Sequence, residues 1–355
     1  MVWMVRWLLV ALGVAAIAVT VLPLAPSNER WIRIWDFPRV QIAACLAVVL
    51  LLLPLVAIPR RRLKAAFAVL LATALAWQVF NIWPYTPFAA PQAEAAVDCP
   101  ADSRIDLLVA NVLIDNRKSA PLFALVDDID PDLILLLETD AWWDDQLEPL
   151  GDVYPHAILH PRENSYGIHL YSRFTLIDPL VRYLIEEDVP SIKTGVLLPS
   201  GAQINLYGLH PKPPPLADTE ERDAELLVVG KEVSDGIIPS IVAGDLNDVA
   251  WSQTNTLFQE VSGLLDPRIG RGLYPTFVAM LPLLRWPVDH VFFDQSFTLL
   301  DLAVLEDIKS DHFPLFVALC HDPSAAARQQ KPEAEPGDLE AADEAIEEGR
   351  EAASD

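Results

Sequence analysis

The sequence predicts a mixed α/β domain preceded by three membrane-spanning helices. Hydrophobic residues make up 52% of the 355 residues, yet the net charge is −25. These two values fit one chain only if apolar and acidic residues are segregated along it. The apolar residues gather in the first 85 positions, and short apolar runs then alternate with amphipathic segments. The length suits one sizeable domain with additional segments.

Residues 1–85 are predicted to form a membrane anchor. Three nearly uncharged runs, 7–24, 40–58 and 63–83, each approach the ~20 residues that a helix needs to cross a bilayer. A signal peptide would account for the first run alone, and two more follow it closely. Tryptophans favour the headgroup level, and six of the ten lie at or near the ends of these runs. They are Trp3, Trp7, Trp31, Trp35, Trp77 and Trp83.

Basic residues in the loops predict how this anchor is oriented. The link between the second and third runs carries Arg60, Arg61, Arg62 and Lys64, and Arg6 lies on the same side. The other loop mixes arginines with acidic residues. Because positive loops stay in the cytoplasm, we expect everything after residue 85 to lie outside it. In a bacterial-type cell this means a multi-pass protein of the inner (plasma) membrane with a periplasmic or extracellular domain.

The three cysteines are compatible with an oxidising compartment. Cys45 lies inside a predicted span, whereas Cys99 precedes the first soluble strand and Cys320 ends the last one. A disulfide between these two and a pair of unrelated free thiols are both compatible with the sequence. The disulfide requires strands 104–111 and 315–320 to be adjacent and antiparallel.

The rest of the chain divides into three parts. Residues 86–103 are rich in Pro and Ala and predict a tether, and residues 104–321 predict the soluble domain. Residues 322–355 are acidic with hardly any bulky apolar side chains, so we expect a disordered tail with at most a weak helix at 337–353.

Within the soluble domain, apolar runs bounded by turn residues predict strands, and amphipathic segments predict helices. Ser119 before Pro121 starts the first helix, and several acids favour the N-terminus of the helix at 219–233. The predicted strands are 105–112, 132–137, 166–172, 175–185, 195–198, 204–209, 241–244, 288–293, 297–304 and 315–319, and the predicted helices are 119–129, 219–233 and 251–261.

Polar side chains stand where several of these strands end. A buried run leads into Gly244, followed by Asp245 and Asn247 two residues apart. Such a carboxylate and carboxamide suit attack on a phosphate, although Gly-Asp and Asn-Asp are also common turn dipeptides. Asn111 ends the first soluble strand, and Glu138 follows five aliphatic residues. Desolvation of Glu138 must be offset by a partner, and a divalent cation is the obvious one.

Histidines occupy three similar positions. His210 ends a strand and enters the run Pro-Lys-Pro-Pro-Pro at 211–215, whose prolines fix the backbone beside it. Asp289 and His290 form a polar break in an apolar strand, and Asp311 and His312 precede the final one. We interpret the more isolated histidines as structural. They are His156, His160, His169 and His321.

In their order along the chain, these stretches resemble the endonuclease/exonuclease/phosphatase superfamily, which has the DNase I-like fold. The resemblance covers about residues 104–319 and runs from Asn and Glu at the first two strand ends, through His and Gly-Asp-x-Asn, to Asp-His and Ser-Asp-His. The three spans and the His-Pro-Lys-Pro-Pro run are similar to a membrane-anchored bacterial subgroup. The resemblance implies a four-layered α/β sandwich built on two packed sheets, with the site at one edge.

The resemblance also implies a metal site. Glu138 would be the principal ligand, helped by Asn111, and Asp311 would take a second metal or orient the first. Mg²⁺ is the expected ion, with Mn²⁺ as a substitute, because the ligands are oxygens and there is no thiolate or histidine cluster for zinc.

The remaining residues would carry the chemistry. His312, oriented by Asp289, would contact the scissile phosphate or polarise the attacking water. Asp245 would activate or position the nucleophile, and Asn247 would bind a phosphate oxygen. His210 would act as an acid towards the leaving group, although no acidic partner for it is evident in the sequence.

The sequence therefore predicts a membrane-anchored, divalent-metal-dependent phosphoester hydrolase, of phosphodiesterase or nuclease type, acting outside the cytoplasm. Nucleic acid, phospholipid and small-molecule phosphoesters stay open as substrates, although few basic clusters are present for duplex DNA. The alternative is a non-catalytic membrane-anchored binding or scaffold protein on the same fold. It is disfavoured because the acids, the amides and the histidines are all present. No protein partner is inferred.

Overall fold

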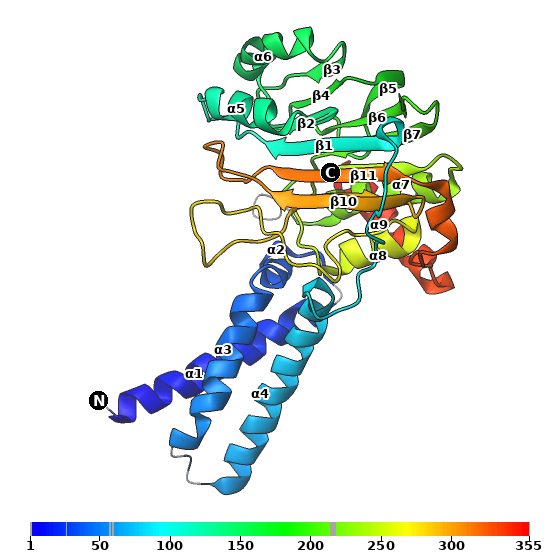
Figure 1. Ribbon diagram of the computed structural model, residues 1–355. Coiled ribbons are helices and arrows are strands. Elements are labelled where there is room, and N and C mark those ends of the chain that lie inside the picture. Colours follow the sequence, from blue (N-terminus) through cyan, green and yellow to red (C-terminus); the bar gives the residue numbers. More distant parts are fainter. Residues whose placement is uncertain (1, 26, 57, 59, 214–217, 355) are drawn as a thin grey trace.

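Two β-sheets packed face to face lie at one end of a bundle of apolar helices (Figure 1). The computed structural model describes residues 2–25, 27–56, 58, 60–213 and 218–354.

Each sheet has one parallel pair among antiparallel neighbours. The first has the order β10-β11-β1-β2-β4-β3 with β1 and β2 parallel, and the second has the order β5-β6-β7-β8-β9 with β7 and β8 parallel. The strands are β1 Arg104–Asn111, β2 Leu133–Leu137, β3 His156–His160, β4 Ile168–Ser172, β5 Thr175–Tyr183, β6 Pro190–Leu197, β7 Gln203–Leu209, β8 Ser240–Asp245, β9 Asp289–Phe293, β10 Phe297–Val304 and β11 Leu315–His321.

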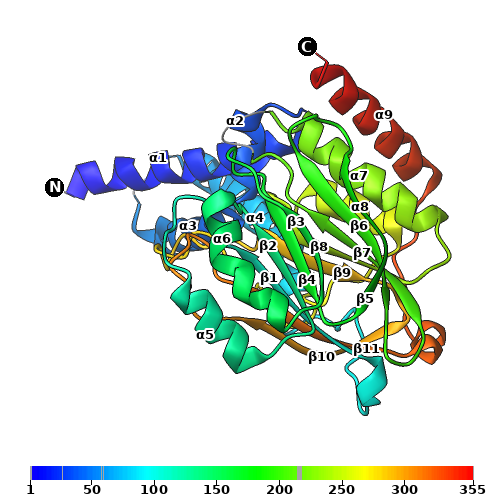
Figure 2. The ribbon, with the colours of Figure 1, turned by 90° about the horizontal axis from the view of Figure 1, so that it is seen from above.

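Helices cover the outer face of each sheet, which gives the four layers implied by the resemblance (Figure 2). The first sheet carries α5 (Ala120–Ile129) and α6 (Ala141–Leu147), and the second carries α7 (Glu220–Asp235) and α8 (Gln253–Ser262). The main core lies between the sheets and consists of aliphatic side chains such as Leu107, Leu135 and Leu206, which are fully buried. Burial on both faces explains why these strands are nearly continuous apolar runs.

Two elements escaped the sequence analysis. Helix α6 is short, and it begins where Asp140 accepts a hydrogen bond from the backbone N–H of Trp143 (2.9 Å). Strand β3 pairs only with β4, at the edge of its sheet. A short helix and a half-exposed edge strand leave little hydrophobic periodicity in the sequence.

The C-terminal segment is ordered where we expected disorder. Helix α9 (Pro336–Ala352) packs along α7 and buries Ala342 and Ile346. Gly349 allows the close contact, since a Cβ there would lie 2.3 Å from the Cβ of Ala224. Composition predicted too little apolar surface, but small residues spaced along one face of a helix are enough when the partner helix is already in place.

The predicted tether is likewise part of the domain. Between residues 86 and 103 the chain runs beside β10, where Leu299 donates to the carbonyl of Glu94 and accepts from the N–H of Ala96, both at 2.8 Å. Ala93 is buried in the main core. A segment without periodicity can still be ordered by pairing with an exposed sheet edge.

A disulfide closes the domain. Strands β1 and β11 are adjacent and antiparallel, with Arg104 opposite Cys320. Cys99 and Cys320 are bonded, with their Cα atoms 5.7 Å apart. The pairing that the sequence left open is therefore present, and Cys45 is free.

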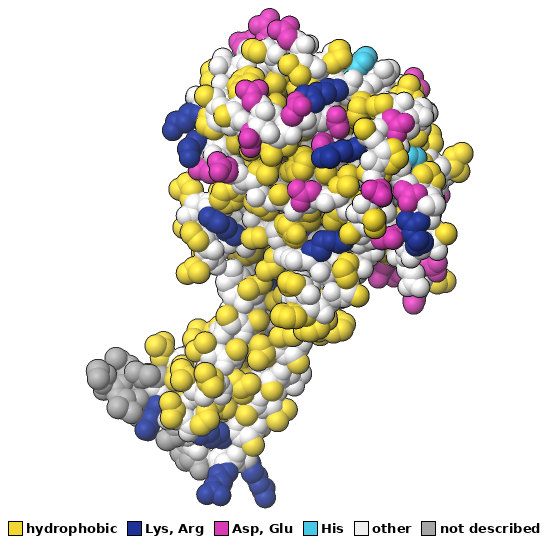
Figure 3. Space-filling view, in the orientation of Figure 1, with side chains coloured by type: hydrophobic (Ala, Val, Ile, Leu, Met, Phe, Trp, Pro, Cys, Tyr) yellow, Lys and Arg dark blue, Asp and Glu magenta, His cyan; other side chains and the backbone are white. Residues whose placement is uncertain are grey.

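The N-terminal helices are α1 (Val2–Val21), α2 (Arg30–Arg33), α3 (Arg39–Leu52) and α4 (Arg61–Ile82). By length and composition, α1 and α4 can each cross a membrane. The second predicted span corresponds to two helices bent by 71°, 30–36 and 39–55, so the described residues contain two candidate spans, or three if this pair counts as one. Lysines and arginines stand at the end of the bundle farthest from the sheets (Figure 3).

Short 3₁₀ helices extend or join these elements. They are Leu22–Leu24, Ile34–Asp36, Leu53–Leu55, Trp83–Tyr85, Ala101–Ser103, Glu148–Asp152 and Pro323–Ala327.

Candidate active site

The predicted site residues come together at one edge of the sandwich. Asn111 ends β1 and Glu138 follows β2, and these strands are parallel, so both side chains reach the same edge of the first sheet. Asp245 ends β8 and lies directly opposite Asp289, the first residue of antiparallel β9. The carboxyl ends of neighbouring parallel strands thus gather side chains that are far apart in the sequence.

The carboxamide of Asn111 bridges the two sheets. Its Nδ2 donates to Oε1 of Glu138 (2.9 Å) and to Oδ2 of Asp245 (3.1 Å). Its Oδ1 accepts from the backbone N–H of Leu113 (3.0 Å). In this orientation Asn111 positions the two acids as a donor, and its oxygen keeps a second lone pair for the ligand role we expected.

The backbone around two site residues is in the left-handed region. Glu138 has φ 62° and Asn247 has φ 52°. Such values are uncommon for residues other than glycine and persist only where the surrounding structure imposes them. Oε2 of Glu138 accepts from the backbone N–H of Ile114 (3.1 Å), which holds the side chain at the sheet edge. Gly244, just before Asp245, has φ 149°.

His312 lies between two carboxylates. Its Nδ1 is 2.9 Å from Oδ2 of Asp289, and its Nε2 is 3.4 Å from Oδ2 of Asp245. Burial by itself would lower the pKa of His312, but the charges of Asp289 and Asp245 together raise it to about 10. The ring is therefore an imidazolium at neutral pH, suited to contact with an anionic phosphate.

Asp311 is the remaining predicted metal ligand. Burial raises the pKa of its carboxyl, the charge of His312 opposes this rise, and the charge of Glu138 adds to it. The charge of Glu138 therefore disfavours the ionised form of Asp311. A divalent cation between them would relieve that repulsion, and their oxygens suit Mg²⁺, so the residues fit the expected ion.

A second group among the described residues has metal-binding geometry. Ligand atoms of Asp245, Asp289 and His312 lie within 4.8 Å of one another. We favour Glu138 with Asp311 as the metal-binding pair, because a protonated His312 offers no lone pair to an ion.

His210 differs from its expected role. It is buried, with Nε2 at 3.8 Å from Oδ2 of Asp245 and its ring 5.6 Å from that of Tyr166. Burial lowers its pKa to about 4, the charge of His312 contributing, and Nδ1 has no hydrogen-bond partner among the described residues. A neutral imidazole is a weak acid, so this environment does not support proton donation to a leaving group.

Asn247 is fixed by two hydrogen bonds. Its N–H donates to Oδ1 of Asp245 (3.0 Å), and its Nδ2 donates to the carbonyl of Pro211 (2.9 Å), which leaves a second N–H on Nδ2 for a substrate oxygen. Within the predicted proline run, Pro214 and Pro215 lie outside the described residues.

The loop after Asn247 depends on buried charges that the sequence analysis did not single out. Arg222 of α7 donates to the carbonyl of Asn247 (3.0 Å) and forms ion pairs with Asp223 (2.7 Å) and Asp248 (3.3 Å). His290 points away from the site and lies with Nε2 at 2.8 Å from the carbonyl of Asp248. No local pattern distinguishes these residues from surface charges, because their partners are distant in sequence.

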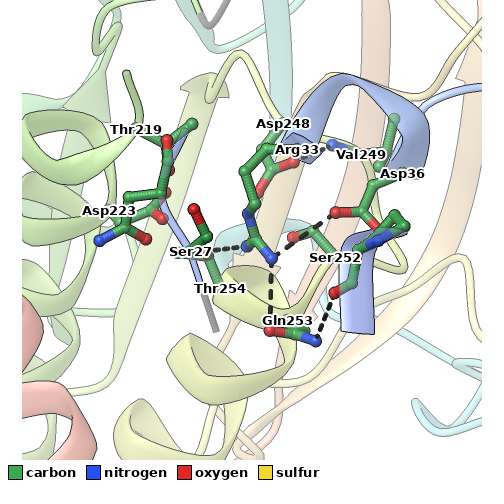
Figure 4. A network of polar contacts seen from close by, with 12 residues as sticks. Ser27, Arg33, Asp36, Thr219, Asp223, Asp248, Val249, Ser252, Gln253 and Thr254 are labelled. Atoms are coloured by element: carbon green, nitrogen blue, oxygen red, sulfur yellow. Dashed lines mark hydrogen bonds and ion pairs between the residues drawn. The ribbon is translucent and has the colours of Figure 1, made fainter. Parts of the chain in front are cut away.

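The same loop and the start of α8 contact helix α2 and the 3₁₀ helix that follows it (Figure 4). Arg33 donates to Gln253 (3.2 Å) and Thr254 (3.3 Å) at the start of α8. The indole N–H of Trp251 donates to the carbonyl of Asp36 (2.7 Å). The N-terminal helices are therefore joined to the loop that carries Asn247 by buried polar contacts.

Comparison with known proteins agrees with this geometry. The sequence model of the Endonuclease/Exonuclease/phosphatase family matches residues 108–312, more than half of the chain. The chain belongs to this family. Members of the family generally hydrolyse phosphoesters with a divalent metal, which is consistent with the acids and histidines at the sheet edge. A search of curated proteins found no match.

Solved structures of the family share the fold. A humanised D. rerio TDP2 carrying 14 mutations has a TM-score of 0.52 and 16% identity, covering 61% of this chain and 99% of that one. An endonuclease/exonuclease/phosphatase from Beutenbergia cavernae has a TM-score of 0.52 and 20% identity, covering 62% and 72%. The human Nocturnin catalytic domain with a bound sulfate has a TM-score of 0.50 and 18% identity, covering 62% and 96%. At these identities the likeness is one of fold.

Proposed function

We propose that this protein is a membrane-anchored, Mg²⁺-dependent phosphoester hydrolase that acts outside the cytoplasm. One observation carries the proposal: the Asn111 carboxamide joins Glu138 to Asp245, and Asp245 in turn faces His312. Hydrolysis of a phosphoester needs a carboxylate for a metal, a second carboxylate to position water and a cation for the phosphate. Glu138, Asp245 and His312 are suited to these three tasks.

In this proposal Glu138 and Asp311 would hold the divalent ion, and the bound ion would supply positive charge beside the substrate phosphate. Mg²⁺ is the preferred ion and Mn²⁺ a substitute. His312, kept protonated by Asp289, binds a phosphate oxygen as a cation. Asp245 is well placed to position the attacking water and accept its proton, because burial raises the pKa of its carboxyl.

Two further side chains complete the phosphate site. Asn247 offers its remaining N–H to a phosphate oxygen, from a backbone held by Asp245. Burial lowers the pKa of His210 to about 4, so we assign its neutral ring a hydrogen bond to the substrate, and the leaving oxygen takes its proton from solvent. Asn111 acts by positioning Glu138 and Asp245 through its amide group.

The apolar helices support an anchor of the membrane-anchored bacterial type. Helices α1 and α4 have the length and composition of membrane spans, and we propose the bent pair of α2 and α3 as the third. The arginines at the start of α4 lie at the end of the bundle away from the sheets (Figure 1). With that end in the cytoplasm, the catalytic domain lies in the periplasm or outside the cell, where a disulfide such as that of Cys99 is stable.

The experiment is a substrate panel with the purified full chain in lipid nanodiscs. Phospholipids, single- and double-stranded DNA, bis-p-nitrophenyl phosphate and p-nitrophenyl phosphate are each incubated with Mg²⁺, Mn²⁺ or EDTA. We expect release of product with at least one phosphoester, abolished by EDTA and restored by added Mg²⁺. Turnover that persists in EDTA would contradict the metal, and no turnover on any substrate would favour a binding or scaffold protein.

Matched variants separate chemistry from folding. Asp245→Asn keeps the shape of the side chain but removes the proton acceptor, so the rate should fall by roughly 10³-fold or more. Glu340→Gln on the exposed face of α9 makes the same kind of change away from the site and should leave the rate unaltered. Near-ultraviolet circular dichroism of both variants reports whether the fold is intact.

A further inference from the structure

An exposed apolar hairpin stands beside the candidate active site. Phe277 and Trp286 pair at its base, where the N–H of Phe277 donates to the carbonyl of Trp286 (3.1 Å). Between them the chain turns through five consecutive exposed apolar residues. We call residues 277–286 the apolar hairpin, and its tip consists of Met280, Leu281, Pro282, Leu283 and Leu284.

The tip is not explained by packing within the chain. Met280 is 80% exposed and Leu283 is 85% exposed. Isolated surface leucines are ordinary, but a contiguous run of large apolar side chains marks a surface that contacts another apolar phase. Ala279, next to the tip, is buried, so the hairpin is anchored at its base while its tip projects.

The base of the hairpin is part of the catalytic edge. The ring of Phe277 lies 4.7 Å from that of His312, and the N–H of Ala279 donates to the carbonyl of Asp311 (2.7 Å). The base of the hairpin therefore contacts both a proposed metal ligand and the imidazole that faces Asp245. A surface that contacts the tip would therefore lie close to the candidate active site.

The other side of the hairpin touches the helical bundle. Nε2 of Gln41, in the first turn of α3, donates to the carbonyl of Leu283 (2.8 Å). The ring of Phe37 meets that of Trp286 edge to face, with centroids 5.8 Å apart. In Figure 1 the corresponding gold loop lies beside the domain end of the bundle. The hairpin thus continues the apolar surface of the candidate spans.

Aromatic rings mark the expected headgroup level at this end of the bundle. Trp83, at the end of α4, stacks on Phe88, and these residues are 49% and 81% exposed. Trp31 of α2 is exposed as well. Amphipathic rings at helix ends favour the membrane interface. With α1 and α4 as spans, the domain end of the bundle, where Gln41 holds the hairpin, would therefore lie at the bilayer surface.

We propose that the apolar hairpin dips into the bilayer and that the substrate is a lipid whose phosphoester is presented at headgroup level to His312. The proposal deepens the hydrolase function and rests on it. In this arrangement the side chains of the hairpin tip contact acyl chains in the leaflet. The candidate active site at the base of the hairpin contacts the phosphate. Arg285 adds a cation on the flank of the hairpin, where its guanidinium donates to the carbonyl of Ala279 (2.7 Å). A lipid surface is favoured over a protein partner because the hairpin is continuous with the span that α3 contributes.

The first test measures insertion without using activity. In a Cys45→Ser background, Leu283→Cys is labelled with the environment-sensitive fluorophore NBD in the full chain. The protein is reconstituted in vesicles of phosphatidylcholine and phosphatidylglycerol with or without doxyl-labelled lipid. We expect blue-shifted emission and quenching by doxyl lipid. The matched control is Ile237→Cys, which is 98% exposed on the loop after α7 and should emit as in water, unquenched.

The emission at position 283 decides whether the hairpin inserts into the bilayer. Purified protein and lipid contain no protein partner, so protection of position 283 but not 237 supports a lipid contact. Water-like, unquenched emission at 283 would overturn the proposal and leave a protein partner as the occupant of the hairpin. This readout stands even if no phosphoester is ever turned over, so failure of insertion and failure of the hydrolase function are distinguishable.

The second test concerns the substrate class. The double variant Met280→Ser, Leu283→Ser is compared with wild type and with Ile237→Ser on phospholipid in vesicles and on soluble bis-p-nitrophenyl phosphate. We expect the ratio of the vesicle rate to the soluble rate to fall at least about tenfold for the double variant. An unchanged ratio, or a wild type that turns over only the soluble diester, would refute the lipid substrate.

Discussion

Oδ2 of Asp289 lies 2.9 Å from Nδ1 of His312. Asp289 is the first residue of β9 and lies directly opposite Asp245 on β8. The same ring faces Asp245 through its other nitrogen. The ion pair with Asp289 thus orients the imidazole that faces the proposed phosphate site, and Asp289 and Asp245 together favour its charged form.

Asp289→Asn should lower the pKa of His312 from about 10 towards 6.5, because the carboxylate that stabilises the imidazolium is removed. The folded pKa lies above that of the unfolded chain, so this pair stabilises fully below pH 6.5, and its contribution is lost as pH rises through about 10. Wild type should exceed the variant in unfolding free energy by about 3 kcal/mol at pH 6, with the difference shrinking towards pH 10. Urea unfolding of both chains at several pH values measures this, and a pH-independent difference would rule the ion pair out as the cause.

Glu138→Gln should abolish Mg²⁺ binding and lower kcat by roughly 10³-fold or more, since the principal anionic ligand is lost while its size is kept. Isothermal titration calorimetry with Mg²⁺ reports binding independently of turnover. Glu163→Gln serves as a control, because that side chain accepts from the N–H of Ala141 and is not one of the proposed metal ligands. Equal Mg²⁺ affinity in wild type and Glu138→Gln would remove Glu138 from the ligand set.

Cys99→Ser should lower the free energy of unfolding by about 2–4 kcal/mol, because the disulfide closes a loop of more than two hundred residues. Thermal unfolding with and without dithiothreitol measures the loss, which reductant should reproduce in wild type. Cys45→Ser, at the free cysteine, is the matched control. If reductant left the melting temperature of wild type unchanged, the bond would not contribute to stability.

Gly349→Val should detach α9 from α7, since a Cβ at this position would lie 2.5 Å from the carbonyl oxygen of Glu220. Limited proteolysis should then cut the C-terminal segment at least several times faster than in wild type. Gly337→Val, where a Cβ meets nothing within 4 Å, tests the same substitution in the same helix without the clash. Equal cleavage rates in the two variants would argue against tight packing of α9.

Much of the catalytic edge was predictable because chemistry at a strand end leaves a local signature. Glu138 follows five aliphatic residues and Asp245 follows a buried run, so each interrupts an otherwise apolar pattern. The sequence left the pairing of β1 with β11 open as the condition for a disulfide, and the register meets that condition with Arg104 opposite Cys320. The roles assigned to the individual side chains stay predictions.

Other features depended on partners that no local pattern contains. The amide oxygen of Asn111 accepts from the N–H of Leu113, which turns its nitrogen towards the acids. The loss of solvent around His210 keeps its ring neutral. Burial and orientation of this kind arise from residues brought together by both sheets. Composition and spacing along the sequence therefore do not predict the orientation of Asn111 or the pKa of His210.

By itself the sequence determined the class of the fold, the segregation of apolar helices from an acidic domain, and the residues that stand at strand ends, because hydrophobic periodicity is a local property of the chain. Only the tertiary structure decided that α9 folds onto α7, that residues 94–96 pair with β10, and that the apolar hairpin stands between His312 and the helical bundle. These contacts join segments distant in sequence, and their free energy comes from surfaces that exist only once both sheets have assembled.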